Sequence, residues 1–409
     1  MHEPLTVAAA LDLVLAQAAP LPPEETPLYA AAGRVLARDV RAVRDLPAFD
    51  NSQMDGYALH LQHDVLATNG QPLEFRIVGS LPAGSSGSYE LTGLETVRVF
   101  TGGPLPANAN AVVMQEQMER VAPTHVRLQA SVERGQFIRR AGSDVRAGEV
   151  ALHAGDVLTP AAIGLLASLG ATAAPVHRTP WVAILSTGDE LVPLGHEPGP
   201  NQTIEGNSLM LAAALGALGI EQVRIGREPD DPAAIRHALG ALLEGTDVLL
   251  ITGGVSVGEH DHVKGLLEEL GVEQVFWRVR QRPGKPLYCG RRGATIVLGL
   301  PGNPASTLFT FYHYVWPLLR TMQGFVGTAA HLRRRRAWLE TPARGIGGLT
   351  QFLRGQLWES PEGEGWVRAL GGQGSHQMRP FALANCLIVL PERDGMYGAG
   401  EGVECLVLP

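Results

Sequence analysis

Three short apolar runs, each ending in a glycine-rich turn, constrain the fold of this chain more than any other feature. They are WVAILSTG, DVLLITGG and ATIVLGLP, at residues 181–188, 247–254 and 294–301. Strands that alternate with helices predict an open parallel α/β sheet. Ligands bind such sheets at the carboxyl ends of the strands, so these turns mark a candidate site. The expected helices cover residues 207–219, 231–244, 261–271 and 303–322.

The segments outside this α/β region have a different texture. Residues 5–19 and 29–38 have helical spacing and predict an N-terminal helical arm. Residues 51–143 are strand-like and rich in turns, which is typical of a small β domain. Residues 145–178 return to a helical texture and predict that this β domain is inserted into the arm. Residues 337–409 are strand-like again.

The expected fold is therefore a multidomain α/β plus β protein. It has a helical arm with an inserted β domain, an open α/β domain with a mostly parallel sheet, and a C-terminal β domain. The run Arg333–Arg336 is interpreted as a solvated hinge. The expected domains are 1–45 and 144–178 for the discontinuous arm, 46–143 for the inserted β domain, 179–326 for the α/β domain and 327–409 for the C-terminal domain.

Composition excludes several classes of function. The chain has 409 residues and a net charge of 33 − 41 = −8, which argues against nonspecific binding to nucleic acid or to an anionic membrane. Its three cysteines lie far apart without a CxxC pair, so a disulfide scaffold and a structural zinc site are not expected. We find neither a signal peptide nor a long apolar run. We therefore expect a soluble cytoplasmic protein.

Carboxylates follow the first apolar run. Asp189 and Glu190 lie at the expected carboxyl end of a strand. Hard cations such as Mg²⁺ take oxygen ligands, usually one or two carboxylates with phosphate and water. The alternative is a strand-to-loop turn with solvated acids.

The motif TGGVSVGEHDHVK follows the second run. Gly253 and Gly254 allow close backbone approach to a ligand, and Ser256 adds a hydroxyl. Asp261 opens the next helix, where capping is the alternative role. His260 and His262 are two residues apart and would not share a helical face, so we expect no zinc site there.

Cations and a helix start accompany the third run. The segment RQRPGKPL carries Arg282 and Lys285 around a Pro-Gly turn, which suits phosphate or another oxyanion, although a hairpin with solvated cations is equally open. In GLPGNPAS, Asn303 fits the N-cap and Pro304 the first helical turn. The start of that helix also offers free N–H groups to an anion.

Three further clusters lie outside the α/β region. Asp50 and Asp55 in PAFDNSQMDGYAL fit ordinary turns. Thr101 begins a Thr-Gly-Gly turn that would present N–H groups to an anion or simply connect strands. Asp144, flanked by arginines, is either a solvated, ion-paired residue or a metal ligand.

The order of the strand-end motifs is more informative than any one of them. In sequence they provide carboxylates, then a Gly/Ser loop with an aspartate, then cations beside an anion-ready helix start. A Mg²⁺-dependent phosphoanhydride site needs these features: oxygen ligands, positive charge and tight backbone approach.

Six sequence blocks together closely resemble one family. They are PAFDNSQMDGYA, STGDEL, TGGVSVGEHD, RPGKPL, GLPGNPAS and GGQGSHQMRPFALANCLIVLPE. In this order they resemble the molybdopterin molybdenumtransferases, which catalyse the last step of molybdenum-cofactor synthesis and are related to the C-terminal part of gephyrin. The resemblance extends over nearly the whole chain.

The resemblance implies a fold, a reaction and an assembly. It implies an inserted β domain on a helical arm, a molybdopterin-binding α/β domain and a C-terminal β barrel, in an elongated homodimer with an active site shared between subunits. The implied reaction transfers molybdenum from molybdate to adenylylated molybdopterin, releases AMP and needs Mg²⁺.

The resemblance also implies site residues. The catalytic positions would be Asp55, Thr101, Asp144, Glu190, Asp261 and Lys285, with Glu190 and Asp261 as the magnesium ligands. Arg282 and Lys285 would hold molybdate or phosphate, while Arg354 and Ser375 would close the site. The implied substrate-binding positions are Ser186, Thr187, Gly188, Asp189, Gly253, Gly254, Ser256, Arg282, Pro301, Gly302, Asn303, Pro304, Arg354 and Ser375.

The chain departs from the usual family pattern at three places. Arg282 stands where lysine is usual, Glu205-Gly206-Asn207 where Asp-Ser-Asn is common, and His260 where an aromatic residue is frequent. Three alternatives remain. They are the preceding enzyme, a molybdopterin adenylyltransferase, which is usually a single short domain; a scaffold protein; and a non-catalytic pterin-binding paralogue.

Overall fold

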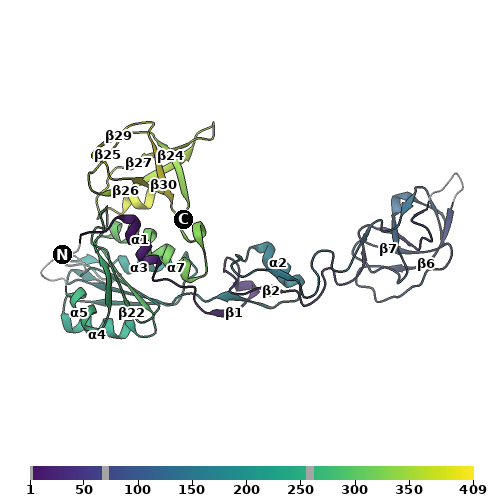
Figure 1. Ribbon diagram of the computed structural model, residues 1–409, viewed down its shortest axis with the longest axis horizontal. Helices are drawn as coiled ribbons and strands as arrows, with labels where there is room; N and C mark the ends of the chain where they lie inside the picture. The colour runs from purple at the N-terminus through teal and green to yellow at the C-terminus, as the bar shows by residue number, and fades with distance from the viewer. Residues whose placement is uncertain (1–2, 67–72, 255–261) are drawn as a thin grey trace. The chain divides into compact units, whose positions relative to one another are not determined.

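The computed structural model describes residues 3–66, 73–254 and 262–409, which form two compact units (Figure 1). Unit 1 comprises Met1–Glu24 and Val176–Pro409, and unit 2 comprises Glu25–Pro175. Each unit has its own apolar clusters.

A six-stranded sheet forms the centre of unit 1. Its strand order is β18-β15-β19-β23-β22-β20. The first four strands are parallel, and β22 and β20 are antiparallel to their neighbours. The predicted open, mostly parallel α/β sheet is thus confirmed. The strands are β15 (Val182–Thr187), β18 (Val223–Glu228), β19 (Val248–Thr252), β20 (Glu273–Trp277), β22 (Tyr288–Arg292) and β23 (Thr295–Leu300).

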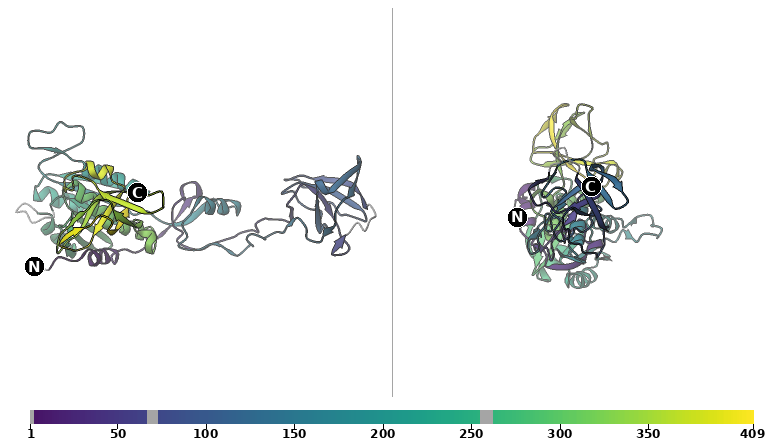
Figure 2. Two further views of the ribbon diagram at one scale, coloured as in Figure 1. Left: turned by 90° about the horizontal axis from the view of Figure 1, so that it is seen from above. Right: turned by 90° about the vertical axis from the view of Figure 1, so that its right-hand side faces the viewer.

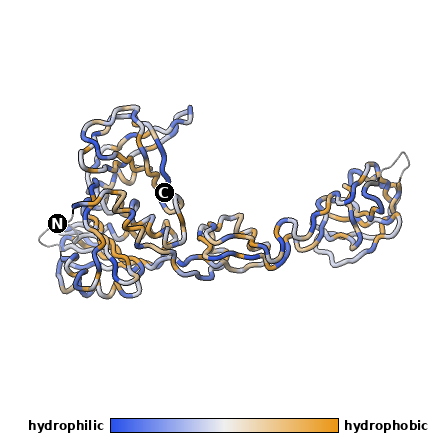
Figure 3. Tube along the Cα trace, viewed as in Figure 1, coloured by the Kyte–Doolittle hydropathy of each residue, from blue (hydrophilic) through white to orange (hydrophobic). Residues whose placement is uncertain are grey.

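Helices cover both faces of this sheet because its central strands are apolar on both sides (Figures 1 and 3). Ile184, Leu250 and Leu298 pack beneath α1, α3, α6 and α7, while Leu185 and Ile251 pack beneath α4 and α5. The helices are α1 (Val7–Leu15), α3 (Asn207–Gly216), α4 (Pro232–Leu243), α5 (Val263–Glu269), α6 (Pro304–Thr310), the π-helical turn η3 (Phe311–Val315), α7 (Trp316–Met322) and the 3₁₀ turn η4 (Gly327–Ala330).

The C-terminal strands close into a five-stranded barrel in the order β26-β27-β24-β30-β28, with β28 pairing back to β26. This C-terminal region is drawn in yellow-green at the top of the right-hand view in Figure 2. The barrel expected from the resemblance is confirmed. Arg334 and Arg335 do not form a hinge: they lie on β24 and pair with Glu404 and Glu359. The elements are β24 (Arg334–Leu339), β25 (Ala343–Gly345), β26 (Thr350–Glu359), β27 (Gly365–Ala369), α8 (Arg379–Leu383), β28 (Cys386–Leu390), β29 (Gly395–Tyr397) and β30 (Gly402–Val407).

Three two-residue strands complete the described part of unit 1. β21 extends the barrel sheet by pairing with β26. β21 belongs to the loop between β20 and β22, residues 279–287, which we call the basic loop. This loop therefore joins the α/β domain to the barrel. β16 and β17 pair in parallel beside the end of β15. These strands are β16 (Leu191–Val192), β17 (Thr203–Ile204) and β21 (Gln281–Arg282).

Unit 2 contains the predicted β domain, a six-stranded sheet in the order β8-β4-β7-β6-β10-β9. Only β6 and β7 are parallel neighbours. Tyr57, Phe75, Val113 and Val126 are among its core residues. The elements are β4 (Gly56–Leu59), β6 (Leu73–Leu81), β7 (Glu95–Val99), β8 (Ala111–Met114), the 3₁₀ turn η2 (Gln115–Gln117), β9 (Met118–Ala122) and β10 (His125–Leu128).

Short antiparallel pairs join the segment that enters this sheet to the segment that leaves it. The expected helix over residues 29–38 is wrong: Gly33 has a φ of +78°, and Val35 bridges to Val157. The domain boundaries given above stay predictions. The elements are β1 (Pro23–Pro27), the 3₁₀ turn η1 (Leu28–Ala30), β2 (Val40–Arg41), β3 (Asn51–Ser52), β5 (Val65–Leu66), β11 (Val132–Glu133), β12 (Ile138–Arg139), β13 (Val150–Leu152), α2 (Pro160–Ser168) and β14 (Ala173–His177).

Candidate active site at the carboxyl edge of the sheet

The three predicted strand ends meet at one edge of the sheet. Ser186 is in register with Thr252, and Thr252 with Leu300, so β15, β19 and β23 end side by side. A cavity of about 730 Å³ lies over these ends, within the roughly 300–1,000 Å³ typical of ligand pockets. Its lining residues are Thr187, Glu190, Leu191, Thr203, Ile204, Glu205, Gly206, Asn207, Met210, Thr252, Gly253, Gly254, Pro286, Pro301, Gly302, Asn303, Pro304 and Met378.

The two acids after β15 have different roles. Glu190 lines the cavity, and its carboxylate lies against Gly188. Asp189 instead accepts a hydrogen bond from the Asp230 backbone N–H at 3.0 Å and holds the loop after β18. Of this predicted pair, only Glu190 is available to a ligand in the cavity.

The turn after β19 must be glycine. Gly253 and Gly254 have φ values of +92° and +64°, which disfavour any side chain. A Cβ at Gly253 would lie 2.6 Å from the Thr187 carbonyl oxygen, and one at Gly254 would lie 2.4 Å from a Val263 methyl. The turn therefore brings bare backbone to the cavity. Ser256, His260 and Asp261 lie outside the described residues.

The third strand end leads into α6. Asn303 occupies the N-cap position, as predicted, but its side chain does not cap the helix. It donates instead to Ser375 Oγ at 3.1 Å, and the Ala305 N–H donates to the Ser375 carbonyl at 3.0 Å. The helix start is thereby joined to the loop after β27, which brings the predicted Ser375 beside Asn303. The prediction of free N–H groups at this helix start is wrong: Pro304 has no N–H, and the N–H groups of Ala305, Ser306 and Thr307 donate to the carbonyls of Ser375 and Asn303.

Asn207 joins two of the strand ends, a role that the sequence did not predict. Its Nδ2 donates to the Gly302 carbonyl at 2.8 Å and to Thr252 Oγ1 at 3.2 Å. Gly206, not Asn207, is the N-cap of α3. Asn207 thus links the start of α3 to the ends of β19 and β23 at the cavity.

Glu205 stabilises the start of α3. Its Oε1 accepts from the Ser208 N–H at 2.9 Å and from Ser186 Oγ at 3.1 Å. Ser186 is fully buried and does not line the cavity. The Glu-Gly departure from the family pattern is therefore compatible with a well-formed helix start.

Arg282 and Lys285 are exposed, and neither forms an ion pair with a described residue. Arg282 lines a second cavity of about 190 Å³ between the basic loop and the barrel. Arg344, which the sequence analysis missed, lines the same cavity. Since Arg344 belongs to no recognised motif, only the fold reveals this second cation.

Arg354 is nearly inaccessible, with 1% of its surface exposed. Its Nη2 donates to the carbonyls of Gly372 and Gly374 at 2.8 and 3.1 Å. Nε and Nη1 have no partner among the described residues. Burial lowers the pKa of this guanidinium. Two unpaired buried donors beside the Ser375 loop fit an anion, because buried polar groups are normally paired.

Asp55, Thr101 and Asp144 belong to unit 2, whereas the other predicted site residues belong to unit 1. Asp55 Oδ1 accepts from the backbone N–H and the hydroxyl of Thr101, at 2.8 and 2.9 Å. These bonds hold the pKa of Asp55 below its usual value. The Asp144 side chain is exposed and has no partner in the described part of the chain.

Three family models match this chain. They are the MoeA N-terminal region (domain I and II) over residues 5–170, a probable molybdopterin binding domain over 183–321, and the MoeA C-terminal region (domain IV) over 336–408. A molybdopterin molybdenumtransferase of Haemophilus influenzae is 36% identical over 386 residues, which cover 92% of this chain and 91% of that protein. The molybdopterin molybdenumtransferase 2 of Mycobacterium tuberculosis is 36% identical over 93% of this chain and 94% of its own.

This chain belongs to the MoeA family. The crystal structure of a molybdopterin biosynthesis MoeA protein from Pyrococcus horikoshii superimposes with a TM-score of 0.85 at 29% identity, covering 99% of both chains. The resemblance seen in the sequence, the multidomain fold and the prediction of an enzyme are confirmed. Among the described residues, no helix has the length and apolar character that crossing a membrane requires.

The cavity of this MoeA chain offers oxygen atoms to a cation. The Glu190 carboxylate lines it, and Thr187 Oγ1 is buried without a partner among the described residues. Oxygen donors are the ligands that Mg²⁺ takes. No cluster of three acidic, histidine or cysteine side chains forms within residues 3–66, 73–254 and 262–409. The Glu190 carboxylate in this lining is an oxygen donor of the kind that Mg²⁺ takes, so the lining fits a magnesium ion in its donor chemistry.

Proposed function

We propose that this chain transfers molybdenum from molybdate to adenylylated molybdopterin with release of AMP, the last step of molybdenum-cofactor biosynthesis. Full-length membership of the MoeA family supports this activity. The observation that carries the proposal is the cavity at the carboxyl edge, in which bare backbone, a carboxylate and a helix start face the same space. This combination suits a substrate with a phosphoanhydride.

The backbone of three turns would bind the pterin substrate and its phosphates. Gly253 and Gly254 allow close approach, and Gly302 leads into the N-terminus of α6. The N-terminal end of the α6 dipole favours negative charge, although the N–H groups of its first turn already have partners. Thr187, Pro301 and Pro304 line the same cavity, which supports their implied substrate-binding roles. Ser186 and Asp189 would act indirectly, by holding the edge in shape.

Glu190 and Asp261 would hold magnesium. Bound magnesium supplies a Lewis acid that offsets the negative charge developing as the phosphoanhydride breaks. Glu190 would place its carboxylate in the cavity, where it could hold such an ion. In the overall reaction, an oxygen of water or molybdate would add to the adenylyl phosphorus and leave within AMP. The two dithiolene sulfurs of molybdopterin would replace oxygens of molybdate, which leave as water with the thiol protons.

The oxyanion would be held by the buried cation Arg354 and the exposed cations Arg282 and Lys285. The loop that carries Arg282 and the loop after β27 line one cavity. Arg354 has two unpaired donors, and Ser375 lies on the loop to which Arg354 donates. Arg282 and Lys285 add exposed positive charge. Guanidinium groups match tetrahedral oxyanions through paired N–H donors, so the change from lysine to Arg282 retains this capacity.

The assembly and location remain part of the proposal. We propose a cytoplasmic homodimer with no nucleic-acid or membrane partner. Its shared active site receives Asp55, Thr101 and Asp144 from unit 2. Two hydrogen bonds from Thr101 orient the Asp55 carboxylate and hold its pKa below the usual value, which favours the charged form that would act on a cation or a polar substrate.

The test is release of AMP from adenylylated molybdopterin with Mg²⁺, with and without molybdate, for wild type and Asp261→Ala. Molybdate-dependent release in the wild type alone supports the proposal. Consumption of ATP with molybdopterin in place of this release would replace it by an adenylyltransferase. Tight pterin binding without either turnover would point to a scaffold or pterin-binding protein.

A further inference from the structure

The basic loop between β20 and β22 alternates exposed cations with buried anchors. Arg282 and Lys285 are exposed, whereas Gln281, Pro283 and Gly284 are buried. The base of the loop is closed by a hydrogen bond from the Val279 N–H to the Lys285 carbonyl at 3.0 Å. The cations therefore project from a loop whose other side is packed into the protein.

Gln281 holds the loop from inside. Its side chain is 1% exposed, and Nε2 donates to the Gly284 carbonyl at 2.8 Å. Its Oε1 accepts from the Tyr314 hydroxyl at 2.5 Å. The Gln281 amide thus connects Gly284, at the tip of the basic loop, to the continuous helical segment formed by α6, η3 and α7. Burial raises the pKa of Tyr314, which keeps the phenol protonated as a donor.

Tyr314 lies on the π-helical turn η3, in the middle of the helix that begins at the site. π-Helical turns within α-helices are rare, and those that occur are often found at functional sites. Gly284 rests on the same helix: a Cβ there would lie 2.7 Å from a Thr310 methyl. One helix therefore carries Asn303 at the cavity and supports the basic loop.

We infer that Tyr314 is a positioning residue, which through Gln281 fixes the basic loop so that Arg282 and Lys285 present their charges in one arrangement to the anionic substrate. This inference rests on the proposed role of those two cations. Tyr314 is fully buried and Gln281 nearly so, and both therefore act through the loop without touching substrate.

Removing the Tyr314 hydroxyl has a defined physical effect. Gln281 Oε1 becomes a buried acceptor without its donor, and such groups tend to seek other partners. The amide can then turn away from Gly284, which releases the tip of the loop. A loop that populates several conformations binds the anion in only one of them. The apparent affinity for the anion therefore falls in proportion to the fraction of the protein in that binding-competent conformation.

The test compares wild type with Tyr314→Phe in the full chain, using molybdate alone as the probe. Calorimetry should show molybdate binding weakened about 5-fold or more, from loss of one buried hydrogen bond. Hydrogen exchange of residues 279–287 should accelerate at the same time. Gln281→Leu should have a similar effect, and the double variant little more, because both act through one chain of bonds.

Tyr397→Phe is the matched control. Tyr397 is a buried barrel tyrosine whose hydroxyl donates to the Pro391 carbonyl at 2.8 Å, so this variant also loses one hydrogen bond. Its melting temperature should fall comparably to that of Tyr314→Phe. Its molybdate affinity and its exchange over residues 279–287 should equal those of the wild type.

A fall in melting temperature in Tyr314→Phe with unchanged molybdate affinity and unchanged loop exchange would overturn the inference and leave Tyr314 a core residue only. The proposed function is tested separately by AMP release in the wild type. Absence of that release, with molybdate binding still weakened in Tyr314→Phe, would sink the proposed function and keep the positioning role.

Discussion

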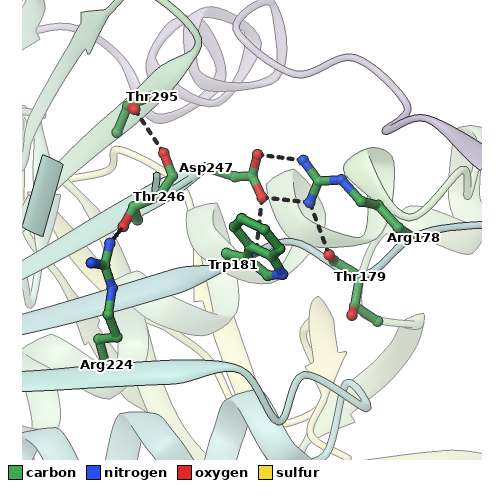
Figure 4. Close-up of polar contacts among 7 residues, drawn as sticks. All are labelled: Arg178, Thr179, Trp181, Arg224, Thr246, Asp247 and Thr295. Atoms are coloured by element: carbon green, nitrogen blue, oxygen red, sulfur yellow. Dashed lines mark hydrogen bonds and ion pairs between the residues drawn. The ribbon is translucent and has the colours of Figure 1, made fainter. Parts of the chain in front are cut away.

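The two edges of the α/β sheet in unit 1 differ in how completely their polar groups are paired. At the amino edge, Asp247 accepts from Arg178 Nη1 and Nη2 at 2.7 and 2.8 Å and from the Trp181 N–H at 2.7 Å (Figure 4). Thr295 donates to the Thr246 carbonyl at 2.7 Å in the same view. Each of these groups has its partner within the protein.

At the carboxyl edge, Thr187 and Glu190 belong to the lining of a cavity. Thr187 Oγ1 is buried without a partner among the described residues, and Glu190 opens into the space over the strand ends. Buried polar groups normally find partners, so unpaired ones indicate where a ligand completes the structure. The amino edge thus holds this sheet together, while the carboxyl edge is left incomplete for chemistry.

The largest expected effect is a loss of activity on substitution at the carboxyl edge, with no such loss at the amino edge. Glu190→Gln should lower the rate of AMP release by roughly 100-fold or more, because a carboxylate that holds the metal is lost. Its melting temperature should match that of wild type, since the one described hydrogen bond of Glu190 is accepted by its backbone carbonyl from the Thr203 N–H, which the substitution keeps. The assay is steady-state AMP release.

Glu221→Gln is the control for this change, because Glu221 is exposed and precedes β18 at the amino edge. It should retain wild-type activity. Equal activity in Glu190→Gln and wild type would remove Glu190 from the site and break the distinction between the edges.

The next effect separates the edges by stability. Asp247→Asn should lower the free energy of unfolding by about 2 kcal/mol, because the charge that pairs with Arg178 is removed from a largely buried position. Urea denaturation measures this loss. The variant should keep its rate of AMP release at temperatures where it is folded. A reduced rate in fully folded protein would show that the amino edge contributes to catalysis.

The smallest effect comes from one substitution made at both edges. Thr295→Val should cost about 1 kcal/mol, because the Thr246 carbonyl loses its donor. Thr187→Val should cost nothing measurable in the apo protein, because its hydroxyl has no described partner. Thr187→Val should instead weaken binding of adenylylated molybdopterin several-fold. Equal destabilisation in the two variants would contradict the difference between the edges.

The sequence predicted the parts of this site that depend on local pattern. β15, β19 and β23 are continuous apolar runs that end in glycine or proline, and such runs are identifiable without tertiary information. Edge strands β18 and β20 were not predicted because they mix charged and apolar residues. The extended conformation of β18 and β20 depends on pairing with the neighbouring strands β15 and β22, and the local sequence pattern does not reveal this pairing.

Tertiary contacts explain the remaining differences. Gly33 and the bridge from Val35 to Val157 override a helical pattern in residues 29–38. The bonds from Asn207 to two strand ends and the unpaired donors of buried Arg354 depend on segments distant in sequence. No spacing rule along the chain encodes them.

A crystal structure with adenylylated molybdopterin and Mg²⁺ tests the central claim most directly. The account predicts the pterin substrate at the carboxyl edge, with its phosphates against Gly253, Gly254 and the start of α6 and its anhydride beside Glu190. Substrate bound away from the ends of β15, β19 and β23, with this cavity filled by solvent alone, would contradict it.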